Sequence, residues 1–160
     1  MSGIIGGAGS KSGVIGWPDL APNRPAFCAR GYPDGSEATY LFYGHNNSGS
    51  TNVVDYNVGN HYTASTGSFV APVTGLYSFS ISDLTSSTND VYRFDFYVND
   101  NYINRQMRID TNDTGGGYGF GEQTIQWQLS ASWSMRIYHR EGVTSVNEIV
   151  YNSFSGYLIG

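Results

Sequence analysis

The sequence predicts an all-β protein, built as an antiparallel sandwich or barrel. Three observations predict this class. Apolar side chains alternate with polar ones over short runs, Gly, Asn, Ser and Thr interrupt these runs at short intervals, and apolar residues at helical spacing are almost absent. About ten short strands separated by such turns are typical of a sandwich or barrel.

The clearest strand runs from Asp90 to Val98, where aromatic and polar side chains alternate with a period of two. Asn99–Asn101 follows as a turn and the chain returns from Tyr102, so we expect a β-hairpin. Residues 110–119 are expected to form a loop because they are rich in Gly, Thr and Asp. The other expected strands are Phe27–Arg30, Tyr40–Tyr43, Asn52–Tyr56, Ser68–Ala71, Gly75–Ser82, Gln123–Leu129, Trp133–His139 and Phe154–Ile159.

Composition and charge narrow the classes of partner. The 160 residues carry 8 Lys and Arg against 13 Asp and Glu, for a net charge of -5, and no basic run is present. Such a chain is not expected to bind nucleic acid. No apolar run approaches the roughly 18 residues that cross a bilayer, so membrane insertion is not expected either. Charged residues are only 13% of the chain, so hydroxyl and amide groups supply most of the surface polarity.

The first 24 residues differ from the rest and are expected to form an attachment arm ahead of a single domain of residues 25–160. Ser2–Gly6 returns as Ser12–Gly16 in a Gly- and Ser-rich background. A phosphate-binding loop is excluded because Ser10 breaks its motif. The repeat instead predicts two short apolar segments on an extended backbone, each of which docks on a neighbouring molecule. The alternative is a disordered N-terminal segment with no function. The expected docking residues of the arm are Ile4, Ile5, Val14 and Ile15.

The spacing of residues in one block, 57–80, points to a protein family more specifically than the composition does. It spaces an amide, an aromatic, a Phe and a Gly-x-Tyr-x-Phe run as in the globular head domain of complement component q, and it resembles that domain and its tumour-necrosis-factor-like relatives. Residues 153–159 look like the last strand of the same family. The chain departs at Thr51 and Ile81, where aromatic residues are usual. The residues that carry the resemblance are Asn57, Tyr62, Phe69, Gly75, Tyr77 and Phe79.

The resemblance implies a ten-stranded antiparallel jelly-roll sandwich of tumour-necrosis-factor-like type, assembled as a homotrimer around the inner sheets. On this mapping Phe154 and Leu158 point to the three-fold axis, while Tyr157 and Ile159 lie in the protomer core. The other interpretation is that Phe154 and Leu158 are ordinary core residues of a monomer. The expected trimer-interface residues are Phe154, Gly156, Leu158, Ser78 and Ser80.

The sequence offers little catalytic or metal-binding chemistry, and no enzyme is expected. His45, His61 and His139 lack the spacing of a metal pair, and no G-x-S-x-G motif is present. The segment from Asp110 starts like a calcium loop but lacks the carboxylate at its twelfth position. No cofactor is expected, although the family resemblance leaves a weak calcium site open. Cys28, the single cysteine, is expected to be a small buried strand residue.

Aromatic residues make up 15% of the chain and raise the question of sugar binding. Trp127 and Trp133 lie in alternating patterns and are expected to be core or trimer contacts. Tyr102 and Tyr118, in or near loops, are the expected ligand contacts, together with Asn46 in a second loop.

Two functions remain. A stand-alone head behind a short arm resembles small virion proteins of tailed bacteriophages, which predicts a trimeric structural protein located in the virion, as a capsid decoration or a fibre tip. Its partners would be its own copies and other capsid or tail components. The alternative is a recognition module for a receptor or host-surface glycan. The sequence has neither a collagen stalk nor a secretory signal, which favours the first hypothesis.

Overall fold

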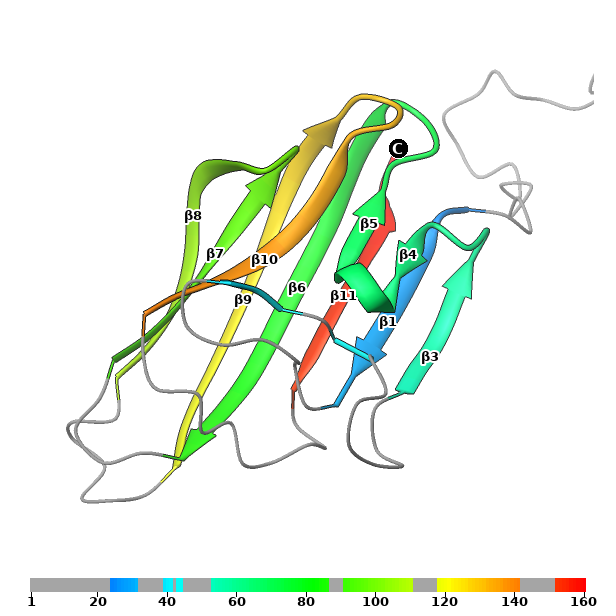
Figure 1. Cartoon of the computed structure of the whole chain (residues 1–160). Helices are drawn as coiled ribbons and strands as arrows, with labels where there is room; N and C mark the ends of the chain where they lie inside the picture. The colour runs from blue at the N-terminus through cyan, green and yellow to red at the C-terminus, as the bar shows by residue number, and fades with distance from the viewer. Residues whose placement is uncertain are drawn as a thin grey trace, which may run out of the picture.

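The computed structural model shows an antiparallel sandwich of two sheets, which confirms the predicted fold class (Figure 1). Most neighbouring strands come from distant parts of the chain, such as β11 beside β1 and β6, or β10 beside β5 and β7, as in a jelly roll. The structure describes residues 24–31, 39–41, 43–44, 53–86, 91–110, 118–141 and 152–160.

The first sheet, here the β11 sheet, has the strand order β3-β1-β11-β6-β9. The last strand, drawn in red in Figure 1, lies between β1 and β6, so the end of the chain completes the middle of this sheet. Its strands are β1 (Ala26–Arg30), β3 (Val53–Val58), β6 (Gly75–Ser86), β9 (Tyr118–Leu129) and β11 (Ser153–Leu158).

The second sheet, here the β10 sheet, has the order β4-β5-β10-β7-β8, and β2 also pairs with β10. A short 3-10 helix, η1 (Ala64–Thr66), joins β4 to β5. The strands are β2 (Thr39–Tyr40), β4 (Tyr62–Thr63), β5 (Ser68–Val70), β7 (Val91–Val98), β8 (Asn101–Asp110) and β10 (Ser134–Glu141).

Aromatic rings from both sheets fill the space between them. Phe27 of β1 stacks on Tyr62 of β4 with 4.4 Å between ring centroids and on Phe69 of β5 with 5.1 Å. Phe154 of β11 meets Phe27 edge-on at 5.0 Å. These rings are buried, and each large ring removes apolar area from water while the T-shaped and stacked contacts fix the spacing of the sheets.

The predicted hairpin is present. β7 pairs with β8 across a turn in which Asn99 and Asp100 have φ of 46° and 60°. Positive φ at both central residues matches the twist of the flanking strands, and Asn and Asp tolerate it better than most residues. The Asn99 side chain also accepts a hydrogen bond from the Ser134 amide at 2.8 Å, which ties the hairpin to β10.

The longest pairing, between β6 and β9, extends beyond the predicted strands 75–82 and 123–129. Asp83 and Thr85 extend β6 with their side chains buried in the core, and they pair with Gly121 and Gly119 of β9. Polar and glycine residues give no apolar alternation, so this extension could not be predicted. The predicted loop at 110–119 shortens accordingly, since β8 runs to Asp110 and β9 starts at Tyr118.

Candidate functional site

The residues that carried the family resemblance build the core and its turns. The Asn57 side-chain amide donates to the Tyr62 carbonyl at 2.7 Å, and the Tyr62 amide donates back to Asn57 Oδ1 at 3.0 Å. The Tyr62 hydroxyl donates to the Tyr43 carbonyl at 2.7 Å. This pair of bonds closes the chain between β3 and β4, so the role of Asn57 and Tyr62 is structural.

Packing explains why Gly75, Tyr77 and Phe79 stand at the start of β6. A Cβ at Gly75 would lie 2.6 Å from Leu158 Cδ1, so only glycine lets β6 and the chain end approach this closely. Tyr77 and Phe79 are fully buried, as is Phe69 in β5. The Tyr77 hydroxyl donates to the Val73 carbonyl at 2.8 Å, which satisfies its one polar group.

The assignment of faces on the last strand is corrected. Phe154, expected at a three-fold axis, is completely buried in the protomer core, and Leu158 packs against the same core. Tyr157, expected in the core, is 54% exposed. Side chains alternate along a strand, so placing Phe154 inward turns Tyr157 outward. Gly156 faces the core too, where a Cβ would lie 2.5 Å from Phe79 Cδ1.

Small side chains occupy much of the outward face of the β11 sheet along β1, β6 and β11, and we call this part the small-residue face. Ser80 pairs with Ser155, and Ser78 pairs with Tyr157. The Ser80 and Thr124 hydroxyls are 2.7 Å apart. Tyr56, Phe120 and Tyr157 stand on this face with about half of each side chain exposed. The face comprises Ala26, Cys28, Ser78, Ser80, Ser82, Thr124, Ser153 and Ser155.

Cys28 lies on the small-residue face and is half-buried, so its expected position in the core is wrong. Its neighbours Phe27 and Ala29 point inward instead. Burial and the nearby Asp55 carboxylate raise the pKa of the Cys28 thiol, which disfavours the reactive thiolate. Asp55 is itself held by Arg30 Nε at 2.7 Å.

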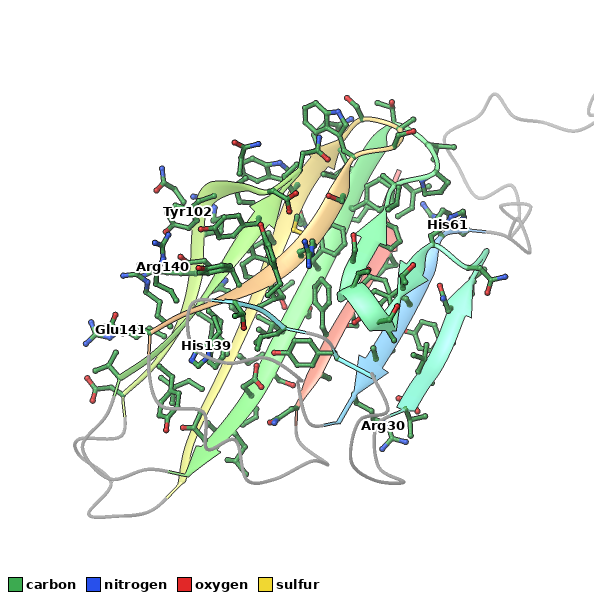
Figure 2. The ribbon with its side chains drawn as sticks, viewed as in Figure 1. Arg30, His61, Tyr102, His139, Arg140 and Glu141 are labelled. Atoms are coloured by element: carbon green, nitrogen blue, oxygen red, sulfur yellow. The ribbon has the colours of Figure 1, made fainter. Side chains whose placement is uncertain are left out.

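The outward face of the β10 sheet is different, because tyrosines cross it from strand to strand. Tyr40 of β2 meets Tyr138 of β10 at 5.3 Å between centroids, and Tyr138 meets Tyr97 of β7 at 5.1 Å. Tyr97 meets Tyr102 of β8 at 5.8 Å. Figure 2 shows Tyr102 and Arg140 close together on this sheet. We call this surface the tyrosine face; it consists of Tyr40, Tyr97, Tyr102, Tyr138, Arg136 and Arg140.

A buried carboxylate fixes Arg140 on the tyrosine face. Asp95 is fully buried and accepts a hydrogen bond from Arg140 Nε at 2.8 Å. Arg140 Nη2 also donates to the Tyr97 hydroxyl at 3.1 Å. The guanidinium thereby lies 5.6 Å from the Tyr102 ring and 5.7 Å from the Tyr138 ring. Arg93 Nε approaches the other Asp95 oxygen at 3.3 Å, and Arg93 Nη1 lies 3.9 Å from the Glu141 carboxylate.

Arg136 is fixed at the other side of the tyrosine face. Its guanidinium carbon lies 3.5 Å from the centre of the Tyr40 ring, a cation–π contact. Its two terminal nitrogens donate to Asp100 Oδ1 at 3.3 Å and to the Thr66 carbonyl at 2.9 Å. Burial and a hydrogen bond to Asp100 raise the pKa of Tyr40 to about 12, so this hydroxyl stays neutral at physiological pH.

Sequence reasoning found Tyr102 but missed the rest of the tyrosine face. Tyr102 is 37% exposed at the start of β8. The missed signal was the polar side of two predicted strands: Arg93, Asp95 and Tyr97 alternate outward in one, as do Arg136, Tyr138 and Arg140 in the other. Tyr and Arg are enriched at protein interfaces, so their alternation on the polar side of these strands is the signal that could have found this face.

Besides Asp95 and its partners, a cluster of three buried polar side chains, Tyr43, Asp83 and Asn152, lies inside the sandwich. Tyr43 donates a hydrogen bond to Asp83 Oδ2 at 2.5 Å, and both side chains are buried. Asn152, also buried, accepts from the Leu84 amide at 2.7 Å. Among the described residues, Asp83 Oδ1 and Asn152 Nδ2 have no hydrogen-bond partner. Burial raises the pKa of Asp83 to about 8, although the Tyr43 hydroxyl opposes this by stabilising the carboxylate.

The described residues show no arrangement typical of catalysis. His139 is buried, stacks on Phe94 with 5.1 Å between ring centroids and places Nε2 3.0 Å from the Glu141 carbonyl, so it is built into the core. Within the described part of the chain, no three His, Cys, Asp or Glu side chains are grouped to hold a metal. No helix there is long and apolar enough to cross a membrane.

Several predicted residues cannot be placed. Asn46 and His45 lie outside the described residues, as do most of the segment considered for calcium and the arm residues Ile4, Ile5, Val14 and Ile15. Tyr118 is the first residue of β9, but its side chain is not described. Trp127 packs partly buried against the core, whereas Trp133 is 42% exposed after the β9–β10 turn and is not a core residue.

The strand order and aromatic core define a jelly-roll domain of tumour-necrosis-factor-like type. Residues 43–159 match the C1q domain, and the chain belongs to this family. Domains of this kind are typically trimeric recognition modules and are generally non-enzymatic.

Solved structures show the same fold. The globular domain of the zebrafish complement 1qA protein is 15% identical, with a TM-score of 0.63 over 86% of this chain and 98% of that one. Murine APRIL at pH 5.0 is 7% identical, with a TM-score of 0.62 over 85% of this chain and 99% of that one. Among curated protein sequences, none matches the chain significantly.

Proposed function

We propose that this protein is a non-enzymatic, homotrimeric structural protein of the virion of a tailed bacteriophage, located on the capsid or at a fibre tip and attached through residues 1–24. The observation that most directly supports the proposed homotrimer is the small-residue face of the β11 sheet. Small hydroxyl side chains let sheets from neighbouring copies approach closely, and half-exposed aromatic rings supply area to bury.

The corrected strand faces change which residues make this contact. Ser78, Ser80 and Tyr157 lie on the small-residue face and belong to the proposed interface, whereas Phe154, Gly156 and Leu158 support it from inside the protomer. Burying the exposed half of a tyrosine side chain stabilises an interface by about 1–2 kcal/mol. Several such rings in each of three copies favour a closed assembly over a monomer.

The virion role is supported by the composition of the chain and by its first 24 residues. The surface is poor in charge and rich in hydroxyl and amide groups, and the doubled Ser-Gly-Ile/Val-Ile-Gly repeat offers two apolar grips. In a trimer, three such arms would multiply a weak contact with a capsid or tail protein through effective concentration.

Deletion tests this attachment. Removing residues 1–16, or changing Ile4, Ile5, Val14 and Ile15 to Ser, should abolish binding to purified particles while the head remains a trimer of unchanged mass. Particle occupancy is measured by quantitative gel analysis of sedimented virions. Full occupancy without the arm would show that the head attaches by another surface.

A second candidate function is recognition of a receptor or host-surface glycan, and the tyrosine face favours it. Preordered Tyr and Arg side chains are the groups that dominate binding energy at recognition surfaces. The two functions are compatible, because a fibre tip both belongs to the particle and contacts the host.

A further inference from the structure

The tyrosine face presents four rings in a row across four strands, β2, β10, β7 and β8. The row is held before any ligand arrives, because strand pairing sets the rings opposite one another: Tyr138 faces Tyr40 across β2–β10, and Tyr97 faces Tyr102 across β7–β8. Tyrosine has few rotatable bonds, so such rings bind with a small loss of conformational entropy.

Charge on the tyrosine face is balanced within the protein. Arg140 and Arg93 share the buried Asp95 carboxylate. Arg93 also lies 3.9 Å from the Glu141 carboxylate, and Arg136 pairs with Asp100, so three guanidinium groups are matched by three carboxylates. An anionic ligand would have to compete with these carboxylates, and a cationic ligand would meet the guanidinium groups. The surface is therefore suited to a ligand without net charge.

In the described part of the chain, polar side chains lie among the rings. The groups interspersed among the four tyrosines are Arg136, Arg140 and Asp95, and the Tyr102 hydroxyl lies 3.4 Å from Gln106 Oε1. Val70, an exposed aliphatic residue of this sheet, pairs with Ser134 at the end of β10. Protein interfaces usually have an apolar centre, whereas this surface alternates ring faces with hydrogen-bonding groups.

We propose that the tyrosine face binds a neutral oligosaccharide. A sugar ring has one face of C–H bonds, which suits the negative face of an aromatic ring, and a rim of hydroxyls, which suits guanidinium, carboxylate and phenol groups. Tyr102, at the exposed end of the row, stacks a sugar ring, and Arg140 donates to its hydroxyls. The site deepens the recognition function and rests on it, while the trimer and virion proposals do not depend on it.

The test uses the full chain on an array of neutral hexose and N-acetylhexosamine oligosaccharides, printed beside sialylated and sulfated ones and beside glycoproteins before and after deglycosylation. We expect binding to neutral oligosaccharides. The best of these is then titrated by NMR to give a dissociation constant per site. Tyr102→Ala should weaken binding at least tenfold, and Tyr102→Phe, which keeps the ring, should stay within about twofold.

Trp133→Ala is the matched control, because Trp133 is an exposed aromatic residue after the β9–β10 turn that belongs to neither the tyrosine face nor the small-residue face, and its dissociation constant should equal that of the wild type. Thermal unfolding and mass are measured on each variant. No bound neutral oligosaccharide, binding only to charged ones, binding that survives deglycosylation, or an unchanged Tyr102→Ala would each overturn the inference. Because mass is read on the same samples, a trimer that binds no sugar refutes only this site, and a monomer that binds refutes only the trimer.

Discussion

Replacing Asp83 by Asn should change how the stability of the protein depends on pH. Asp83 is buried in the sandwich, and within the described part of the chain Tyr43 is its hydrogen-bond partner and its other carboxyl oxygen has none. Its pKa is raised from an ordinary 3.8 to about 8 by burial. Below pH 4 the carboxyl is protonated in the folded and unfolded chains alike. Between pH 4 and 8 only the unfolded chain ionises, so the folded state loses stability as pH rises, and the loss levels off above pH 8.

The magnitude follows from the two pKa values. Their difference corresponds to a loss on the order of 5 kcal/mol at pH 9 relative to pH 3, at about 1.4 kcal/mol per pH unit. Asn removes this loss because it does not ionise, but its amide leaves one buried donor unpaired at a cost of about 1–3 kcal/mol. Asp83→Asn should therefore be more stable than the wild type by about 3 kcal/mol at pH 9, which is about 6–12 °C in Tm.

Thermal unfolding followed by circular dichroism from pH 3 to pH 9 measures this effect. The quantity to compare is the difference in Tm between variant and wild type, because other groups titrate in both proteins. Thr85→Val, which changes a buried residue of the same strand that carries no ionisable group, is the control and should give a difference that does not grow with pH. If Asp83→Asn also gives a constant difference, Asp83 is ionised in the folded protein and the reasoning from burial fails.

Three further changes test packing and assembly. Gly156→Ala places a Cβ 2.5 Å from Phe79 and 2.9 Å from Phe27, and should lower the free energy of unfolding by about 1–3 kcal/mol in denaturant titration. Asn57→Ala removes both hydrogen bonds to Tyr62 and should cost about 2 kcal/mol by the same measurement; an unchanged midpoint for either would refute its structural role. Ser80→Arg adds a charged side chain to the small-residue face and should dissociate the trimer in sedimentation without unfolding the protomer, whereas an intact trimer would place the interface elsewhere.

The fold could be predicted because its strands are locally regular. The alternation predicted over residues 90–98 is present over Val91–Val98, as are the Asn-Asp turn after it and the spacing from Asn57 to Phe79, and each depends on neighbours in sequence. Asp83 and Thr85 show the limit. Their side chains are buried in the core although they are polar. The glycines that pair with them on β9 have no side chain and so leave space beside them.

The candidate site was harder to predict, because a period of two does not say which side of a strand faces the core. At the last strand this ambiguity exchanged the roles of Phe154 and Tyr157. The tyrosine face has a different obstacle. Tyr40 and Tyr138 are almost a hundred residues apart in sequence, and only the pairing of β2 with β10 brings their rings within 5.3 Å.

The mass of the protein in solution tests the proposed homotrimer most directly. We would measure it by sedimentation equilibrium at several concentrations, on the full chain and on a variant that lacks residues 1–16. The comparison shows whether the head forms the trimer without its arm. The proposal predicts a mass of about three times 17.5 kDa for the full chain and three copies for the variant. A mass near 17.5 kDa for the full chain at all concentrations would contradict it, since the small-residue face would then be an ordinary solvent-exposed surface.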